Sequence, residues 1–164
     1  MRATILALAA LTLGALMLAG CDNQKPAAVP YDLTAESNQK FLADNKAQKG
    51  VVTTTSGLQY RVLSSGNGPK VSSTADVATV TYKGWTIDGH VFDQTQQGQT
   101  ANFPVGGLIP GWVEALQLMR VGDEWQLVIP AELGYGAQGA GADIGPNQTL
   151  VFNMKLLAIA PPSP

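Results

Sequence analysis

Four segments of this sequence alternate apolar and polar residues with a period of two, which is the period of a β-strand with one buried face. They are residues 58–62, 79–83, 125–129 and 150–156. Between the second and the third lies the dipeptide Asp88-Gly89, which favours a tight hairpin turn between two short apolar runs. These short alternating segments predict several antiparallel strands.

One short amphipathic helix is predicted to begin at Pro110, because proline suits the first helical position. Four apolar residues follow at helical spacing and share one face: Trp112, Ala115, Leu116 and Met119. Residues 131–148 are rich in glycine and have no period, so we expect one long loop. A loop of this length inside a compact domain is typically functional or disordered. The pattern alone predicts an α+β fold with one sheet packed on one helix, and it leaves the strand order open.

The composition excludes several classes of function. The chain has 164 residues, of which 45% are hydrophobic and 13% charged, so it can build a core. A formal net charge of −2 offers no basic surface for nucleic acid. One histidine, His90, and one cysteine, Cys21, are too few for a Ser-His or Cys-His catalytic site or an ordinary zinc site. We therefore expect neither a metal nor a cofactor.

The first twenty residues have the pattern of a secretory signal peptide. Arg2 precedes an apolar run at 5–18, which is shorter than the ~20 residues that span a bilayer. The run Leu-Ala-Gly-Cys at 18–21 resembles a bacterial lipobox, which implies lipidation of Cys21 after cleavage. An ordinary secretory signal and an uncleaved anchor are the alternatives. A lipobox predicts a protein anchored in the bacterial cell envelope and facing the periplasm, and Asp22 favours the inner membrane.

A tether and one helix are predicted between this cysteine and the first strand. Residues 21–33 contain two prolines and little periodicity, as in a flexible linker. Thr34 suits the N-cap and Gly50 the C-terminal cap of a helix over residues 35–48. The main apolar side chains of this helix are Phe41 and Leu42. Two side chains bury too little area to offset the cost of association, so we expect a solvated helix and a monomeric protein.

Five ordered blocks resemble the FKBP family of peptidyl-prolyl cis-trans isomerases, over about residues 56–158. The blocks are Val-Thr-Tyr-Lys-Gly at 80–84, Gly-His-Val-Phe-Asp at 89–93, Leu-Ile-Pro-Gly-Trp at 108–112 with Glu-Ala-Leu-Gln-Leu-Met at 114–119, Leu-Gly-Tyr-Gly at 133–136, and Thr-Leu-Val-Phe at 149–152. Gly-Leu-Gln-Tyr at 57–60 and the run Ile-Pro-Gly-Trp are most similar to the macrophage infectivity potentiator branch. The resemblance implies a five-stranded antiparallel sheet wrapped around one short helix. The expected division is a signal peptide at 1–20, a lipidated tether at 21–33, a helix at 34–50 and an isomerase domain at 52–160.

The resemblance also implies an aromatic pocket between the sheet and the helix. It implies these catalytic residues: Tyr82, Phe92, Asp93, Trp112, Tyr135 and Phe152. It implies these substrate-binding residues: Phe103, Leu108, Ile109 and Ile144. Trp112 is expected as the floor of the pocket, and the Ile109 amide as a donor to a substrate carbonyl. Alternatives stay open for three of these residues, since Phe152 also fits a core position, Asp93 a turn cap and Tyr135 loop packing.

Such a pocket implies isomerisation of X-Pro bonds during folding of envelope or secreted proteins, without a nucleophile, metal or base. The twisted amide has less charge separation than the planar amide, so an apolar site favours it. The implied partners are proline-containing polypeptides, and macrolide inhibitors of the FKBP class are further ligands. Four departures from the family pattern bear on macrolide affinity and substrate preference: Ala101, Ala140, Asp143 and the short stretch Gly106-Gly107. The alternative functions are a non-catalytic chaperone or partner-binding module with the same pocket, and a purely structural lipoprotein.

Overall fold

The computed structural model describes residues 31–162, in which one antiparallel sheet is accompanied by two α-helices. Helix α1, Ala35–Lys46, precedes the sheet, and helix α2, Pro110–Leu118, lies between the fifth and sixth strands in the chain. The strands are β1 Val51–Thr53, β2 Gln59–Ser64, β3 Val77–Thr86, β4 Val91–Gln94, β5 Ala101–Pro104, β6 Glu124–Ile129 and β7 Leu150–Ala160. Three short 3-10 helices complete the described part: η1 Val105–Gly107, η2 Ala131–Leu133 and η3 Gly136–Gln138.

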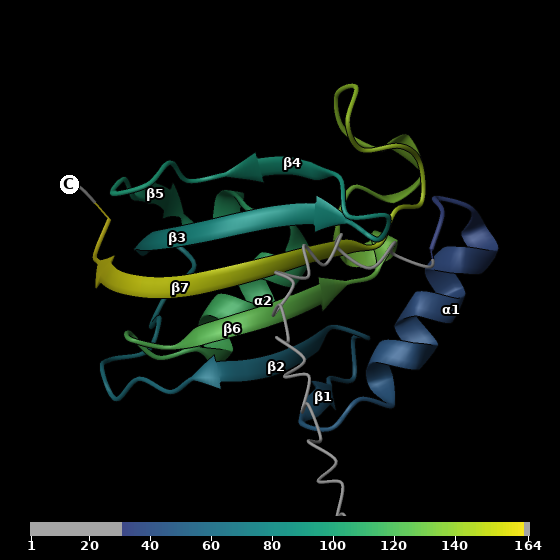
Figure 1. The fold of residues 1–164 in the computed structure, drawn as a ribbon. Helices are drawn as coiled ribbons and strands as arrows, with labels where there is room; N and C mark the ends of the chain where they lie inside the picture. The colour runs from purple at the N-terminus through teal and green to yellow at the C-terminus, as the bar shows by residue number, and fades with distance from the viewer. Residues whose placement is uncertain (1–30, 163–164) are drawn as a thin grey trace, which may run out of the picture.

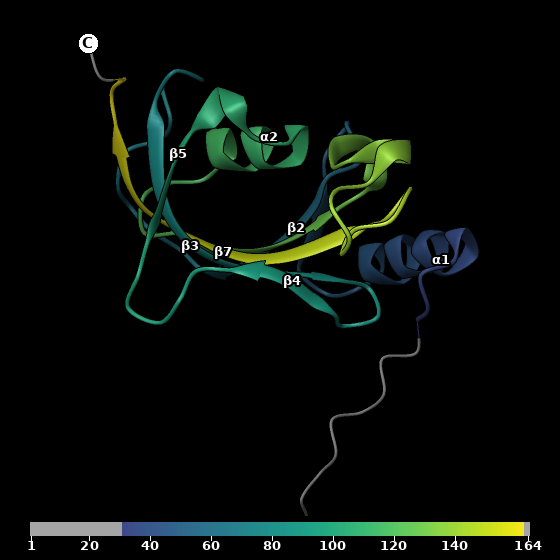
Figure 2. The same cartoon turned by 90° about the horizontal axis from the view of Figure 1, so that it is seen from above.

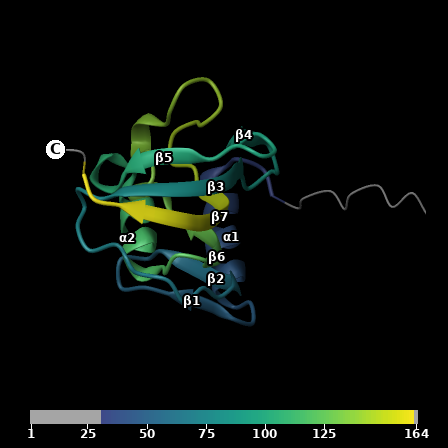
Figure 3. The same ribbon diagram turned by 90° about the vertical axis from the view of Figure 1, so that its left-hand side faces the viewer.

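The strand order in the sheet is β1-β2-β6-β7-β3-β4, and β5 also pairs with β3. Strand β4 pairs with residues 83–85 of β3, whereas β5 pairs with residues 77–80, so β4 and β5 share one edge. Strands β4 and β5 together therefore count as one edge strand, and the three-residue β1 extends the opposite edge beside β2. Counted in this way, the predicted five-stranded antiparallel sheet is confirmed. Figure 3 shows the order along the sheet, from β4 at one side to β1 at the other.

The sheet curves around α2, which lies within its concave face (Figure 2). The predicted apolar face of α2 is confirmed, because Trp112, Ala115, Leu116 and Met119 are all buried. Gly111 allows the helix to lie close to the sheet, since a Cβ atom there would come within 2.6 Å of the Ile129 Cγ2 atom. Each large apolar side chain buried in this way contributes ~1.5–3 kcal/mol. The contact of helix and sheet is therefore the main hydrophobic core.

The predicted hairpin turn and the predicted long loop are both present, but the loop has local structure. Gly89 has a left-handed φ of 88° and its N–H donates to the Thr86 carbonyl at 2.8 Å, which closes the turn between β3 and β4. Residues 131–148 contain η2, η3 and an isolated antiparallel bridge between Ala140 and Ile144. Backbone hydrogen bonds, which leave no periodic signal in the sequence, hold this loop together.

Helix α1 begins after the predicted N-cap, Thr34, whose hydroxyl accepts from the Ser37 N–H at 3.3 Å. It ends two residues earlier than the predicted helix, at Lys46. The buried residue of α1 is the polar Asn38, whereas the two main apolar side chains, Phe41 and Leu42, are half-buried. Phe41 is half-buried and packs edge-on against Tyr31, with ring centroids 5.0 Å apart. Figure 1 shows α1 beside the end of the sheet where β7 starts.

The predicted signal peptide, the lipobox cysteine Cys21 and most of the predicted tether lie outside the described residues. Within residues 31–162, no helix is long and apolar enough to span a bilayer.

Candidate active site

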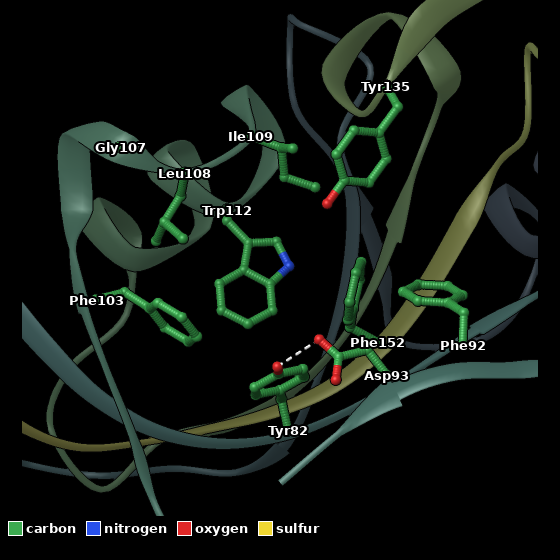
Figure 4. Close-up of a pocket in the computed structure, with 10 residues that line it drawn as sticks. All are labelled: Tyr82, Phe92, Asp93, Phe103, Gly107, Leu108, Ile109, Trp112, Tyr135 and Phe152. Atoms are coloured by element: carbon green, nitrogen blue, oxygen red, sulfur yellow. Dashed lines mark hydrogen bonds between the residues drawn. The ribbon is translucent and has the colours of Figure 1, made fainter. Parts of the chain in front are cut away.

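A pocket of about 270 Å³ opens between the sheet and the start of α2 (Figure 4). Five elements and two loops contribute to its wall: β3, β4, β5, β7, α2, the turn before α2, and loop 131–148. The lining residues are Tyr82, Phe92, Asp93, Phe103, Gly107, Leu108, Ile109, Trp112, Tyr135 and Phe152. Six of the ten are aromatic, so the wall is mainly flat apolar surface with a few polar atoms.

The aromatic rings form a box whose sides stand perpendicular to the indole of Trp112. Tyr82 and Phe152 approach that indole with ring centroids 5.1 and 5.2 Å away and interplanar angles of 83° in both cases. Phe103 approaches it from β5 at 5.9 Å and 82°. Edge-to-face geometry at these distances is favourable for aromatic pairs. The indole therefore forms a flat floor, and Phe92 extends one side by packing edge-on against Phe152 at 5.5 Å.

Two features of the local sequence produce this box. Pro110 begins α2 directly after an extended residue, so Trp112 lies in the first turn of the helix and faces the sheet. Gly84 in β3 leaves room for the two phenylalanines beside it. A Cβ atom at Gly84 would come within 2.5 Å of the Phe152 Cε1 atom and 2.8 Å of the Phe92 Cε2 atom. Any larger residue at position 84 would displace that side of the box.

The polar atoms of the pocket lie around its mouth and floor. The Tyr82 hydroxyl donates to the Asp93 Oδ2 atom at 2.6 Å. Burial, together with this hydrogen bond and the charge of Asp93, raises the pKa of the Tyr82 hydroxyl above its usual value. The phenol, which is protonated at neutral pH even at its ordinary pKa, therefore remains a hydrogen-bond donor further into the alkaline range. The Tyr135 hydroxyl points into the pocket from the opposite side in Figure 4.

Two N–H groups in the pocket have no acceptor among residues 31–162. One is the indole Nε1 of Trp112, whose side chain is only 4% exposed. The other is the backbone amide of Ile109, the residue just before α2. The indole Nε1 atom is fully buried, as is the unpaired indole Nε1 atom of Trp125 outside the pocket. The Ile109 amide belongs to a half-buried residue of the pocket wall and is a suitable donor to a carbonyl group of a bound molecule.

Nine of the ten predicted pocket residues line the cavity, and the tenth does not. Ile144 is 6% exposed and joins the hydrophobic core, because the bridge with Ala140 fixes its backbone and turns its side chain inward. Gly107, which the sequence did not indicate, contributes backbone to the wall. Because glycine has no side chain, the sequence does not indicate which glycine will line a pocket. Within residues 31–162, no three histidine, cysteine or carboxylate side chains lie close enough together to hold a metal ion.

Fold and pocket together define a small α+β domain with a flat-floored aromatic site suited to a compact apolar ring. Residues 68–157 match the family model described as FKBP-type peptidyl-prolyl cis-trans isomerase. Residues 17–62 match a second model, described as the domain amino terminal to FKBP-type peptidyl-prolyl isomerase. The chain therefore belongs to the FKBP-type peptidyl-prolyl cis-trans isomerase family.

Individual relatives agree with this assignment. The chain is 48% identical over 130 residues to the FKBP-type 22 kDa peptidyl-prolyl cis-trans isomerase of Escherichia coli (strain K12), covering 79% of this chain and 63% of that protein. It is 44% identical over 134 residues to the outer membrane protein MIP of Legionella longbeachae, covering 79% and 57%. Its fold is similar to the crystal structure of a peptidyl-prolyl cis-trans isomerase from Pseudomonas syringae, with a TM-score of 0.72, 38% identity, and coverage of 76% and 92%. The chain thus spans less than two thirds of the length of the two curated relatives.

Proposed function

We propose that this protein is a peptidyl-prolyl cis-trans isomerase that acts on X-Pro bonds of proteins folding in the bacterial envelope. The observation that carries the proposal is the aromatic box, in which three rings stand at 82–83° to the buried indole of Trp112. A proline ring is compact, apolar and flat enough to lie on that indole. The family membership of the chain supports the same reaction.

The reaction needs little chemistry beyond this pocket. An X-Pro bond isomerises across a barrier of ~18–20 kcal/mol, which comes from the loss of amide resonance in the twisted state. The twisted amide has less charge separation than the planar amide, so transfer into an apolar site favours it over the ground state. Covalent catalysis is not required for a change of this kind.

The proposed roles follow from the position of each group. Trp112 supports the proline ring, and Tyr82, Phe92, Phe103 and Phe152 flank it. The free Ile109 amide donates to a carbonyl of the substrate, and the Tyr135 hydroxyl faces the substrate from the loop. Asp93 holds the Tyr82 ring by accepting from its hydroxyl. Leu108 lines the edge beside Ile109.

We further propose that a lipid on Cys21 anchors the mature protein in the envelope with its pocket facing the periplasm. The lipobox at residues 18–21 supports this placement, and so does the similarity to a relative named as an outer membrane protein. We propose that the protein is a monomer on its anchor, because the buried Asn38 and the half-buried Phe41 of α1 contact residues of the same chain. Proline-containing polypeptides are the proposed substrates, and macrolides of the FKBP class are proposed ligands of the same box.

The decisive experiment measures cis-to-trans conversion of a Phe-Pro peptide. The rate above buffer should increase in proportion to the concentration of the protein. A second peptide that contains Leu-Pro should slow this reaction as a competitor, whereas its Leu-Ala analogue should not. A rate equal to that in buffer, with the Leu-Pro peptide still bound, would favour the non-catalytic binding module instead.

A further inference from the structure

Helix α1 carries a buried amide side chain that the proposed site does not use. Asn38 is 4% exposed, and its Oδ1 atom accepts from the Thr149 N–H at 2.7 Å. Its Nδ2 group donates to the Thr34 carbonyl at 2.9 Å and to the Gln148 Oε1 atom at 3.3 Å. All of these polar atoms are paired, and a fully paired buried network fixes the geometry of the groups that form it.

Gln148 completes the connection from the other side. Its Nε2 group donates to the Leu33 carbonyl and to the Pro146 carbonyl, both at 3.0 Å. We call Asn38 and Gln148 together the amide latch. The latch joins α1 and the two residues before it to the last residues of loop 131–148, next to the first residue of β7. Figure 2 shows the backbone of α1 beside the start of β7.

The loop that the latch holds also presents Tyr135 to the pocket. Asn147, next to the latch, has a left-handed φ of 56° and its N–H donates to the Gly136 carbonyl at 2.8 Å. Gly136 follows Tyr135, whose own carbonyl accepts from the Gly139 N–H at 3.2 Å. A short run of covalent and hydrogen bonds therefore leads from the latch to the backbone of Tyr135.

The other polar side-chain contact of this loop with a distant element is weaker. His90 in the hairpin turn and Asp143 in the loop have their Nε2 and Oδ1 atoms 3.4 Å apart, and both side chains are more than half exposed. Exposed pairs of this kind contribute little to stability. The buried latch is thus the firmer of the two polar side-chain connections.

We propose that Asn38 is a positioning residue for the pocket, because through Thr149 and Gln148 it fixes the loop that holds the Tyr135 hydroxyl over the aromatic box. This inference rests on the proposed isomerase function. It makes α1 part of the substrate-binding structure. The role is one of binding, so it should affect KM more than kcat.

The first test compares two variants of the full chain, purified in mild detergent, on a Phe-Pro peptide. Asn38→Ala should raise KM about threefold to tenfold with little change in kcat, which is the scale of one lost buried hydrogen bond. Asn45→Ala is the matched control, because it lies on the same helix and its Nδ2 group donates to the Gln59 Oε1 atom at 2.7 Å, away from the loop. The control should keep the KM of the wild type. Equal KM values for both variants would overturn the inference.

A double-mutant cycle asks whether Asn38 acts through Tyr135. If it does, adding Asn38→Ala to Tyr135→Phe should raise KM much less than Asn38→Ala does alone, since coupled sites are not additive. Additive effects would show that Asn38 acts on the fold alone. If Asn38→Ala does not fold, Asn38→Asp takes its place in the cycle. It keeps an oxygen for the Thr149 N–H but loses the donor to Gln148, and it should raise KM about twofold to threefold.

Hydrogen exchange separates the failure of this inference from the failure of the proposed function. In Asn38→Ala the amide of Asn147 should exchange at least ~10 times faster than in the wild type, and in Asn45→Ala it should not. Unchanged exchange of that amide would overturn the inference even if the protein is an active isomerase. A wild type that does not accelerate isomerisation would overturn the proposed function, while faster exchange in Asn38→Ala would still show that the latch holds the loop.

Discussion

Replacement of Trp112 by alanine should weaken both the fold and the proposed activity. The indole is 4% exposed. Its removal eliminates three edge-to-face contacts, with Tyr82, Phe152 and Phe103, at centroid distances of 5.1, 5.2 and 5.9 Å. Truncation of a large buried aromatic residue typically costs ~3–5 kcal/mol. Because the vacated space joins an open pocket instead of forming a closed cavity, we expect the lower end of that range, ~3 kcal/mol.

Urea unfolding followed by circular dichroism measures the stability change. With a denaturant dependence of ~1–3 kcal/mol per molar urea, the midpoint should fall by ~1–3 M. Activity is then measured without denaturant and divided by the fraction of folded protein. The kcat/KM of Trp112→Ala should fall at least ~10-fold, which corresponds to ~1.4 kcal/mol of transition-state binding.

Trp125 supplies the matched control for this experiment. It is 5% exposed and stacks on Tyr60 with ring centroids 4.2 Å apart, but it does not line the pocket. Trp125→Ala should lose a similar amount of stability and keep its activity per folded molecule. If both variants lose the same fraction of activity per folded molecule, then Trp112 acts only through stability and the proposed role of the box is wrong.

Three further predictions concern the pocket mouth, the anchor and the oligomeric state. Asp93→Ala and Tyr82→Phe should each lower activity with a small change in melting temperature, because Asp93 is exposed. If Asp93→Ala lowers the melting temperature as much as Trp112→Ala does, Asp93 is a turn cap. Cys21→Ser should move the protein from the membrane fraction to the soluble fraction with its activity intact, and a variant that stays in the membrane would indicate an uncleaved apolar anchor. Sedimentation of residues 22–164 at micromolar concentration should give a monomer; a dimer that Phe41→Ser dissociates would contradict this.

The sequence was sufficient for the features that depend on local periodicity. The helical spacing from Trp112 to Met119 predicted which face of α2 is buried, because helix geometry alone places those residues on one side. The alternation in residues 150–156 predicted the inward face of β7 for the same kind of reason. The nine predicted residues that line one cavity were implied by the resemblance of the ordered blocks to the FKBP family, and not by local periodicity.

Only the tertiary structure decided how distant segments meet. Asn38 and Thr149 are 111 positions apart, and a single polar residue on a helix gives no periodic signal that it will be buried against a strand end. Ile144 was predicted for the pocket and lies in the core, because the bridge with Ala140 sets the direction of its side chain. Local periodicity tells which face of an element is apolar. It does not tell which long-range hydrogen bonds will pair the backbone groups that remain unpaired at the ends of strands and in loops. In this protein, such hydrogen bonds hold α1 against the loop that carries Tyr135.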